Sequence, residues 1–264
     1  MDDLKFCANL SFLFKEVSLL DRYGAAARAG FAAVECGVDI YQYSLEQLVV
    51  ARETAGVEQA HINAPTGDKP GDRGLAAVPG RHDDFKKSLM KSLEYAKSLH
   101  CTRIHFLAGI HPTEDWDRQQ WEETYVNNLK MAAEECAKEG ITALIEPLVT
   151  VPGYYLTNRK QAQDIINKVS HPSLKLQFDF YHEQISSGNL INFVTENISL
   201  IGHMQVSQVP VRNEPDSEGE INYPFVFQTL ISLGYKKWIG CEYIPRGKTE
   251  DGLVWASRYL NKNN

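Results

Sequence analysis

The sequence lacks several features that would point to a membrane or secreted protein. It contains no run of about twenty apolar residues, which excludes a transmembrane helix. The N-terminus, Met-Asp-Asp-Leu-Lys, has acidic residues where a secretory signal has basic ones. The 5 cysteines are scattered and form no Cys-x-x-Cys motif, so reduced thiols, most of them filling core volume, are expected. These absences predict a cytoplasmic protein with no membrane partner.

The chain also has no excess of positive charge. It carries 27 Lys+Arg against 34 Asp+Glu, a formal charge of −7, which argues against a nucleic-acid partner. No Pro/Ser-rich linker or change in composition divides its 264 residues. We therefore expect residues 1–264 to form one domain, and this length is usual for a single barrel of eight strand–helix units.

Short strand-like stretches alternate with helical patterns along the whole chain. Helical segments repeatedly end in a glycine that leads directly into the next strand, as at Gly30, Gly56, Gly140 and Gly234. Eight strands are expected, at residues 4–10, 32–38, 58–64, 103–109, 142–148, 174–180, 203–209 and 238–244, each followed by a helical pattern. This order predicts the α/β class and a closed (β/α)₈ TIM barrel with its chemistry at the C-terminal strand ends.

A doubly wound open sheet is the alternative fold. It requires a glycine-rich phosphate loop after the first strand, which Asn9-Leu-Ser-Phe-Leu-Phe does not provide. Two helix starts are also predicted. Ser44 and Gln47 resemble a capping box, and Asp83 or Asp84 could cap the helix that ends near Ser98.

Three acids and one amide, Glu146, Asp179, Gln205 and Glu242, lie near the C-terminal ends of the last four predicted strands. Their spacing of about thirty residues is one strand–helix unit, so they should converge. Because neighbouring carboxylates repel, a divalent cation would stabilise the group. Oxygen donors without cysteine favour Mg²⁺ or Mn²⁺ over zinc. The alternative is that each acid caps a helix or pairs with a basic residue at the rim, and that Gln205 is a hydrogen-bonding core residue.

Two further side chains are candidates for substrate binding. His182, three residues after Asp179, could orient a substrate oxygen or act as a helix-cap partner. Arg212 follows the seventh strand on the face suited to bind a carboxylate, with Arg73 and Arg81 as second choices, although an exposed loop arginine is the alternative. The histidines at 100, 105 and 111 flank the fourth strand and cannot all meet. Residues 112–123 are expected to be the solvated start of a helix, or alternatively a partner surface.

Five stretches together resemble the hydroxypyruvate isomerase family of xylose-isomerase-like barrels. They are Ala-Asn-Leu-Ser-Phe-Leu-Phe (8–14), Gly-Leu-Ala-Ala-Val-Pro-Gly-Arg (74–81), Leu-Lys-Leu-Gln-Phe-Asp-Phe-Tyr-His (174–182), Glu-Ile-Asn-Tyr-Pro (220–224) and Ile-Gly-Cys-Glu-Tyr-Ile-Pro-Arg-Gly (239–247). The similarity runs nearly end to end.

The resemblance implies an isomerase that interconverts hydroxypyruvate and tartronate semialdehyde through an enediolate. It implies a metal at Glu146, Asp179, Gln205 and Glu242, proton transfer by Glu146 and Glu242, and, more loosely, a substrate contact for His182. The loop after Glu146 looks shorter than is usual in the family, and His61 replaces an apolar residue.

Other functions stay open at this point. A 2-oxo-tetronate isomerase or a ketose 3-epimerase would use the same site. A phosphodiesterase like endonuclease IV would need a histidine-rich metal cluster and a basic groove, against only 8 histidines and a charge of −7. A barrel that has lost catalysis and serves as a binding module is a further alternative. The sequence does not decide whether the protein is a homo-oligomer.

Overall fold

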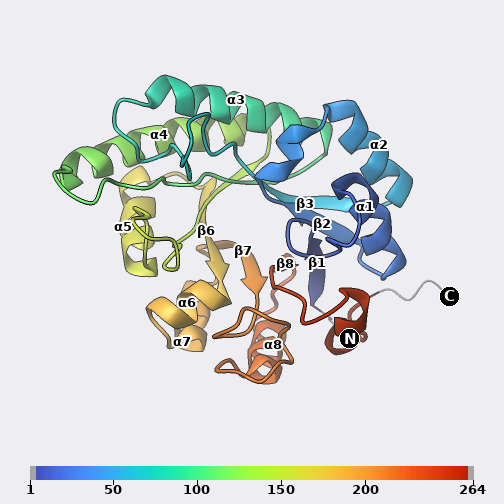
Figure 1. Ribbon diagram of the computed structural model, residues 1–264. Coiled ribbons are helices and arrows are strands. Elements are labelled where there is room, and N and C mark those ends of the chain that lie inside the picture. Colours follow the sequence, from blue (N-terminus) through green and yellow to red (C-terminus); the bar gives the residue numbers. More distant parts are fainter. Residues whose placement is uncertain (1–3, 261–264) are drawn as a thin grey trace.

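The computed structural model describes residues 4–260. Eight parallel strands, hydrogen-bonded in sequence order, close into a barrel with helices around it (Figure 1). The strands are β1 (Lys5–Asn9), β2 (Ala33–Cys36), β3 (Glu58–Asn63), β4 (Arg103–His105), β5 (Thr142–Ile145), β6 (Leu174–Asp179), β7 (Ile201–Val206) and β8 (Trp238–Cys241). The predicted (β/α)₈ barrel is confirmed, and each predicted strand overlaps an observed one.

The helices lie outside the barrel. The α-helices are α1 (Leu19–Arg28), α2 (Leu45–Ala55), α3 (His82–Ser98), α4 (Arg118–Lys138), α5 (Arg159–Val169), α6 (Phe180–Ser186), α7 (Leu190–Asn197) and α8 (Tyr223–Ser232). The 3₁₀ helices are η1 (Val38–Gln42), η2 (Glu250–Gly252) and η3 (Val254–Ala256).

Two local predictions are wrong. Up to residue 260, β8 is followed by η2 and η3 and by no α-helix, because Pro245, Gly247 and Gly252 interrupt that segment. The helix α3 begins at His82 with Arg81 as its N-cap, so Asp83 and Asp84 lie in its first turn and do not cap it. The capping box of Ser44 and Gln47 at α2 is confirmed.

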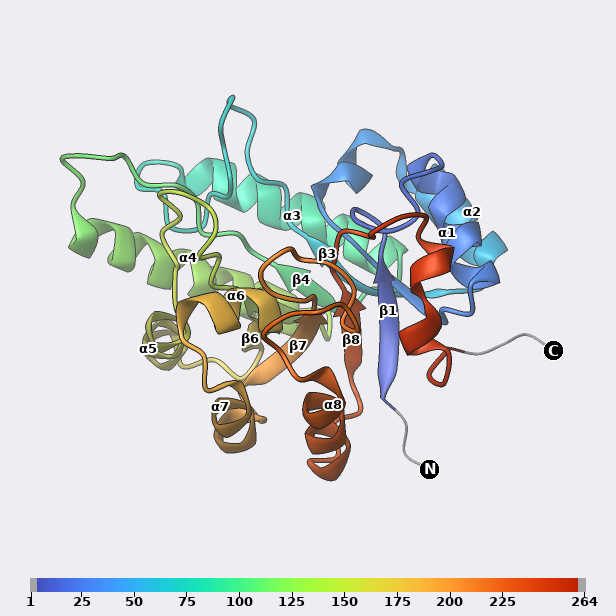
Figure 2. The ribbon, with the colours of Figure 1, turned by 60° about the horizontal axis from the view of Figure 1, so that its bottom comes forward.

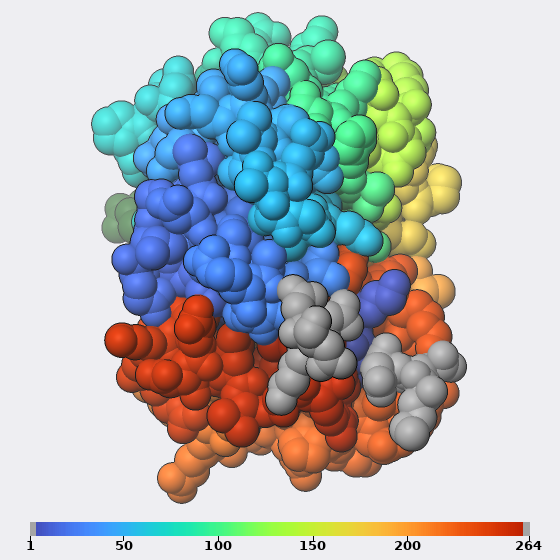
Figure 3. Space-filling model, turned by 90° about the vertical axis from the view of Figure 1, so that its right-hand side faces the viewer, coloured from blue at the N-terminus to red at the C-terminus, as the bar shows by residue number. Residues whose placement is uncertain are grey.

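The barrel closes where the first and last strands pair. Lys5 is in register with Trp238 and Ala8 with Cys241. The N-terminal and C-terminal parts of the chain therefore lie side by side on one face, blue against red in Figure 3.

The two ends of the barrel differ in their connections. At the N-terminal ends, helices turn tightly into strands, as at Gly56, whose left-handed φ of 67° ends α2. At the C-terminal ends, long connections separate β3 from α3, β4 from α4, β5 from α5 and β7 from α8. Long loops at this end provide the walls of a site, as in other barrels of this type.

Strand alternation separates an apolar layer from a polar barrel interior. On β7, Met204 and Val206 belong to the apolar cluster packed against the helices. His203 and Gln205, the alternate residues, are buried and contact Glu35 of β2. The interior at this level is therefore hydrogen-bonded and polar.

All five cysteines are free and buried, as predicted. Among residues 4–260, no helix has both the length and the apolar character required to cross a membrane.

Candidate active site at the C-terminal strand ends

The four predicted metal ligands lie at the same end of four neighbouring strands. Glu146 directly follows β5, Asp179 ends β6, Gln205 is the penultimate residue of β7 and Glu242 directly follows β8. Asp179 is in register with Gln205, and Gln205 with Gly240, two residues before Glu242. The sheet therefore brings together residues that are distant in sequence.

Glu146, Asp179 and His182 form the tightest part of this group. Each offers one ligand atom, and these atoms all lie within 4.8 Å of one another in a buried setting. Asp179 is also the N-cap of α6, because its Oδ1 accepts a hydrogen bond from the Tyr181 amide at 2.9 Å. The other oxygen, Oδ2, lies 3.7 Å from His182 Nε2. Asp179 thus caps a helix with one oxygen and faces the cluster with the other.

Gln177, which the sequence analysis did not single out, connects two of the predicted ligands. Its Nε2 donates to Glu146 Oε2 at 2.9 Å and to Gln205 Oε1 at 2.8 Å. Two ligand oxygens thus converge on a single nitrogen, and their orientations are fixed. The available signal was a polar residue two positions before Asp179, on the same face of β6.

Arg212 lies over the carboxylates. Its Nη2 is 3.3 Å from Asp179 Oδ2 and 3.5 Å from Glu242 Oε2. The guanidinium carbon lies 4.9 Å from the centroid of the Phe12 ring and 5.0 Å from that of the Tyr181 ring. Its backbone has a left-handed φ of 59°. Arg212 is therefore a partly buried counterion, not a solvated loop arginine.

The pKa values of the three acids are raised. Burial raises the pKa of Glu146 well above its usual range, and the charges of Glu242 and Asp179 raise it further. Burial raises the pKa of Asp179 to about 6 and that of Glu242 to about 8, although Arg212 lowers both. One arginine does not compensate three carboxylates, of which Glu146 and Asp179 are buried and Glu242 is partly buried. This oxygen-rich donor set with surplus negative charge fits a hard divalent ion such as Mg²⁺ or Mn²⁺.

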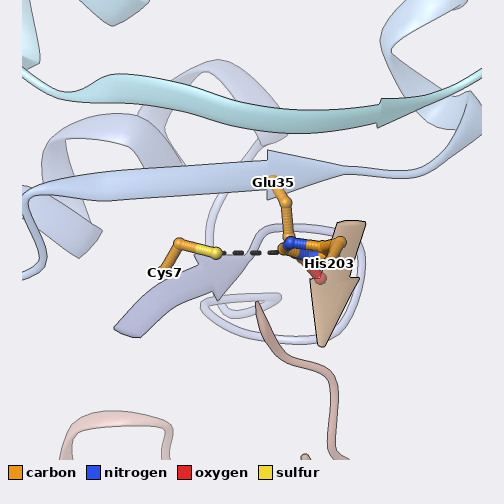
Figure 4. A group of neighbouring side chains, drawn as sticks. All are labelled: Cys7, Glu35 and His203. Atoms are coloured by element: carbon orange, nitrogen blue, oxygen red, sulfur yellow. Dashed lines mark hydrogen bonds and ion pairs between the residues drawn. The ribbon is translucent and has the colours of Figure 1, made fainter. Parts of the chain in front are cut away.

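Glu35 is the second residue that the sequence analysis missed. This fully buried carboxylate accepts hydrogen bonds at Oε1 from Asn9 Nδ2 at 2.8 Å and from Gln205 Nε2 at 2.7 Å. Its Oε2 lies 2.6 Å from His203 Nε2 and 3.5 Å from Cys7 Sγ (Figure 4). Burial would raise its pKa, but His203, His61 and Gln205 outweigh burial and lower it to about 2.

This network holds Gln205 in one orientation. Because Glu35 accepts from its Nε2, the Gln205 carbonyl oxygen faces Gln177 and the site. Cys7, Glu35 and His203 also have ligand atoms within 4.8 Å of one another. Hydrogen bonds account for these contacts, so we interpret the trio as support for the site. A glutamate within the apolar stretch Ala-Ala-Val-Glu-Cys was the signal.

The histidines of β3 and β4 lie beside the site. His105 Nδ1 is 3.4 Å from Glu146 Oε2, and His61 stacks on His203 with centroids 5.0 Å apart. Burial lowers the pKa of His105 to about 3 and that of His61 well below its usual value, so both are neutral near pH 7. His111 stacks on Trp116 outside the barrel, so the predicted separation of the histidines at 100, 105 and 111 holds.

A cavity of about 320 Å³ opens over the predicted ligands. Glu146, Gln177, Gln205 and Glu242 line it, together with Arg73 from the β3–α3 connection. Asp179 is buried and does not line it. The cavity is of a size for a small substrate, and the carboxylate residues Glu146, Glu242 and Asp39 line it.

The closed barrel, with three acids and one amide at the C-terminal ends of β5 to β8, has the architecture of a class of barrel enzymes. Comparison with known proteins identifies this class. The model of the xylose isomerase-like TIM barrel family matches residues 23–263, and the chain belongs to that family.

Within the family, the chain is similar over its whole length to isomerases of small keto acids. A 2-oxo-tetronate isomerase from Cupriavidus necator is 44% identical, covering 98% of this chain and 99% of its own. The hydroxypyruvate isomerase of Escherichia coli is 39% identical, covering 97% and 99%. A crystal structure described as AP endonuclease, family 2, from Brucella melitensis has a TM-score of 0.94 at 40% identity, covering 98% of this chain and 100% of that one. The predicted family and isomerase class are confirmed.

Proposed function

We propose that this protein interconverts hydroxypyruvate and tartronate semialdehyde, with Glu146 and Glu242 as the proton-transfer residues. The observation that carries the proposal is the position of these two carboxylates, one buried and one partly buried, with raised pKa values, in one small cavity. The Escherichia coli relative at 39% identity, named hydroxypyruvate isomerase, supports the choice of substrate.

The reaction moves a carbonyl group by one carbon. A proton leaves C3 of hydroxypyruvate and a proton is delivered to C2, while the hydroxyl proton moves from the C3 oxygen to the C2 oxygen. One carboxylate accepts the C3 proton and the same or the opposite carboxylic acid supplies the C2 proton. A carboxyl group with a raised pKa suits both roles near neutral pH, and such general acid–base catalysis contributes about 10²- to 10⁴-fold in rate.

The proposed metal ligands are Glu146, Asp179, Gln205 and Glu242, and the proposed ion is Mg²⁺ or Mn²⁺. When bound, the ion supplies positive charge that stabilises the negative charge of an enediolate. The protein contributes the orientation of the ligands. Gln177 fixes Glu146 and Gln205, while Arg212 keeps Asp179 and Glu242 near each other. His182, beside Asp179, is proposed to contact substrate oxygens.

A 2-oxo-tetronate isomerase is the second candidate, because the Cupriavidus necator relative of that name is 44% identical. The same carboxylates would move a proton in a four-carbon acid. We do not favour the phosphodiesterase suggested by the name of the Brucella melitensis protein. The group of Glu146, Asp179 and His182 contains one histidine, and a second, His105, lies 3.4 Å from Glu146. In residues 4–260, Arg73 is the only cationic residue lining the cavity, so the basic groove of a phosphodiesterase is absent there.

The substitution Glu242→Gln tests the proposed mechanism. We expect the variant to fold and to lose isomerisation, together with exchange of the C3 hydrogens with solvent deuterium, both followed by proton NMR. The control is Glu218→Gln, an exposed glutamate on the β7–α8 connection. Turnover of Glu242→Gln near the wild-type rate would remove Glu242 from the mechanism.

A substrate panel tests the assignment of the reaction. Wild-type protein loaded with Mg²⁺ or Mn²⁺ is offered hydroxypyruvate, a four-carbon 2-oxo-3-hydroxy acid and a ketose. Preference for hydroxypyruvate is expected. Activity only on the ketose would refute the proposal, and a wild type that retains no divalent ion and turns over none of the three would indicate a binding module.

A further inference from the structure

The contacts proposed so far leave the carboxylate group of a keto acid substrate without a partner. This carboxylate needs a cationic partner in the cavity. Three arginines were candidates from the sequence: Arg212, Arg81 and Arg73. The structure separates them by their existing partners. Arg212 forms ion pairs with Asp179 and Glu242 and lies near two aromatic rings.

Arg81 is also engaged. Its guanidinium pairs with Asp68 at 3.0 Å, with Asp72 at 3.2 Å and with Asp84. Its side chain is only 12% exposed, and it does not line the cavity. A guanidinium with three carboxylate partners has little capacity left for a fourth.

Arg73 differs from both. It lines the cavity that holds Glu146 and Glu242, and it is an exposed residue. Within residues 4–260 it makes no hydrogen bond or ion pair and is the only cationic residue lining that cavity. A free planar guanidinium presents two parallel N–H donors, the geometry that matches a carboxylate.

The backbone on both sides of Arg73 is anchored. On one side, the Gly74 amide donates to the Thr66 carbonyl at 3.0 Å, and Gly74 bridges to Ala108. Gly74 approaches the start of the β4–α4 connection so closely that a Cβ there would lie 2.3 Å from the Leu107 carbonyl oxygen. On the other side, Arg81 holds Asp72. The β3–α3 connection that carries Arg73 projects from the barrel, as Figure 2 shows, but its base is fixed.

We propose that Arg73 binds the substrate carboxylate, and that the site is therefore specific for 2-oxo-3-hydroxy acids over uncharged ketoses. The inference rests on the proposed isomerase function and adds the residue that selects the substrate class. Arg212 has the separate role of balancing the charge of Asp179 and Glu242. In this proposal Arg73 takes the contact for which the sequence favoured Arg212.

The test compares Arg73→Ala and Arg73→Lys with a matched control, Lys69→Ala. Lys69 is an exposed cation on the same connection and does not line the cavity. In metal-loaded Arg73→Ala we expect the KM for hydroxypyruvate to rise by roughly 10- to 100-fold, the usual effect of losing hydrogen bonds to a charged group. We expect kcat to change much less, because the carboxylate is not the reacting centre. Arg73→Lys should fall between, and Lys69→Ala should match wild type.

Chemical rescue adds a readout that a merely structural role would not move. Guanidinium ion at millimolar concentration should lower the KM of Arg73→Ala and leave that of wild type unchanged. If wild type is active and Arg73→Ala has the same KM as wild type, the proposed role of Arg73 is overturned, whereas the proposed function is not. A rise in KM confined to Arg212→Ala would do the same. A wild type without activity on any 2-oxo-3-hydroxy acid would overturn the proposed function and this inference together.

Discussion

The buried carboxylate of Glu35 should be the main electrostatic support of the barrel interior, and Glu35→Gln tests this. The wild-type side chain accepts from Asn9, Gln205 and Cys7 and lies 2.6 Å from His203 Nε2. A glutamine has one acceptor oxygen and turns an NH₂ group toward groups that donate. Removing one partner of a buried charged network costs about 3–5 kcal/mol.

The pKa of Glu35 gives a second value for the contribution of this carboxylate to the free energy of folding. The pKa of Glu35 is about 2 in the folded protein against 4.5 for the free group. This difference corresponds to about 3 kcal/mol of folding free energy. Because the folded pKa is depressed, the contribution is fully present above about pH 4.5 and is lost as the pH falls toward 2. The free energy from the pKa difference therefore agrees in size with the cost expected for breaking the buried network.

Urea unfolding of wild type and Glu35→Gln at pH 7, 5, 4 and 3 measures this contribution. We expect the variant to be less stable by about 3–5 kcal/mol at pH 7. The gap should be constant down to about pH 5 and should narrow below it. Glu94→Gln, an exposed position on α3, is the control. A Glu35→Gln variant within 1 kcal/mol of wild type at pH 7, or a gap that does not narrow in acid, would refute the reasoning.

Three other predictions concern the site and its surroundings. Saturating Mg²⁺ or Mn²⁺ at about 100 times its Kd should stabilise wild type by about 2.7 kcal/mol in thermal unfolding, and Asp179→Asn should lose most of that gain; equal shifts in both would contradict the ligand assignment. Gly74→Ala should cost about 1–3 kcal/mol and raise the KM for the keto acid, because φ is +119° there and an added Cβ meets Leu107. Gly71→Ala, where φ is +88° but no atom lies within 4 Å, is its control and should leave KM unchanged. Burial raises the pKa of Glu183 to about 7, despite Arg159 at 3.5 Å. A raised folded pKa means that stability is lost as the pH rises from about 4.5 through 7, so Glu183→Gln should gain up to about 3 kcal/mol relative to wild type between pH 4.5 and 8, and a pH-independent difference would contradict this.

The arginines near the cavity are of two kinds: those paired with carboxylates of the protein and those that line the cavity without such a partner. Arg212 belongs to the first kind and Arg73 to the second, although both are loop arginines at the same end of the barrel. The two arginines differ in whether they have ion-pair partners, and their positions in the sequence do not show this difference. The β3–α3 connection places Arg73 at the cavity, whereas Arg212 of the β7–α8 connection does not line it.

The sequence by itself determined the fold and the end of the barrel at which the candidate site lies. Strand and helix periodicity is local, and a glycine such as Gly56 ends a helix through its own backbone conformation. Parallel connectivity then requires that residues at the C-terminal ends of successive strands share one rim of the barrel. For this reason Glu146, Asp179, Gln205 and Glu242 could be placed together without coordinates.

Only the tertiary structure decided how these residues are held and which cations remain free. Glu35 contacts His203 and Gln205 across 168 and 170 residues, inside a closed barrel. Gln177 reaches Glu146 on the neighbouring strand, and Arg212 reaches Asp179 and Glu242. Such contacts depend on side-chain direction and distance across strands, which no local pattern encodes. Within residues 4–260, the lack of an ion-pair partner for Arg73 likewise follows from where the acidic side chains lie, and is therefore a property of the folded molecule.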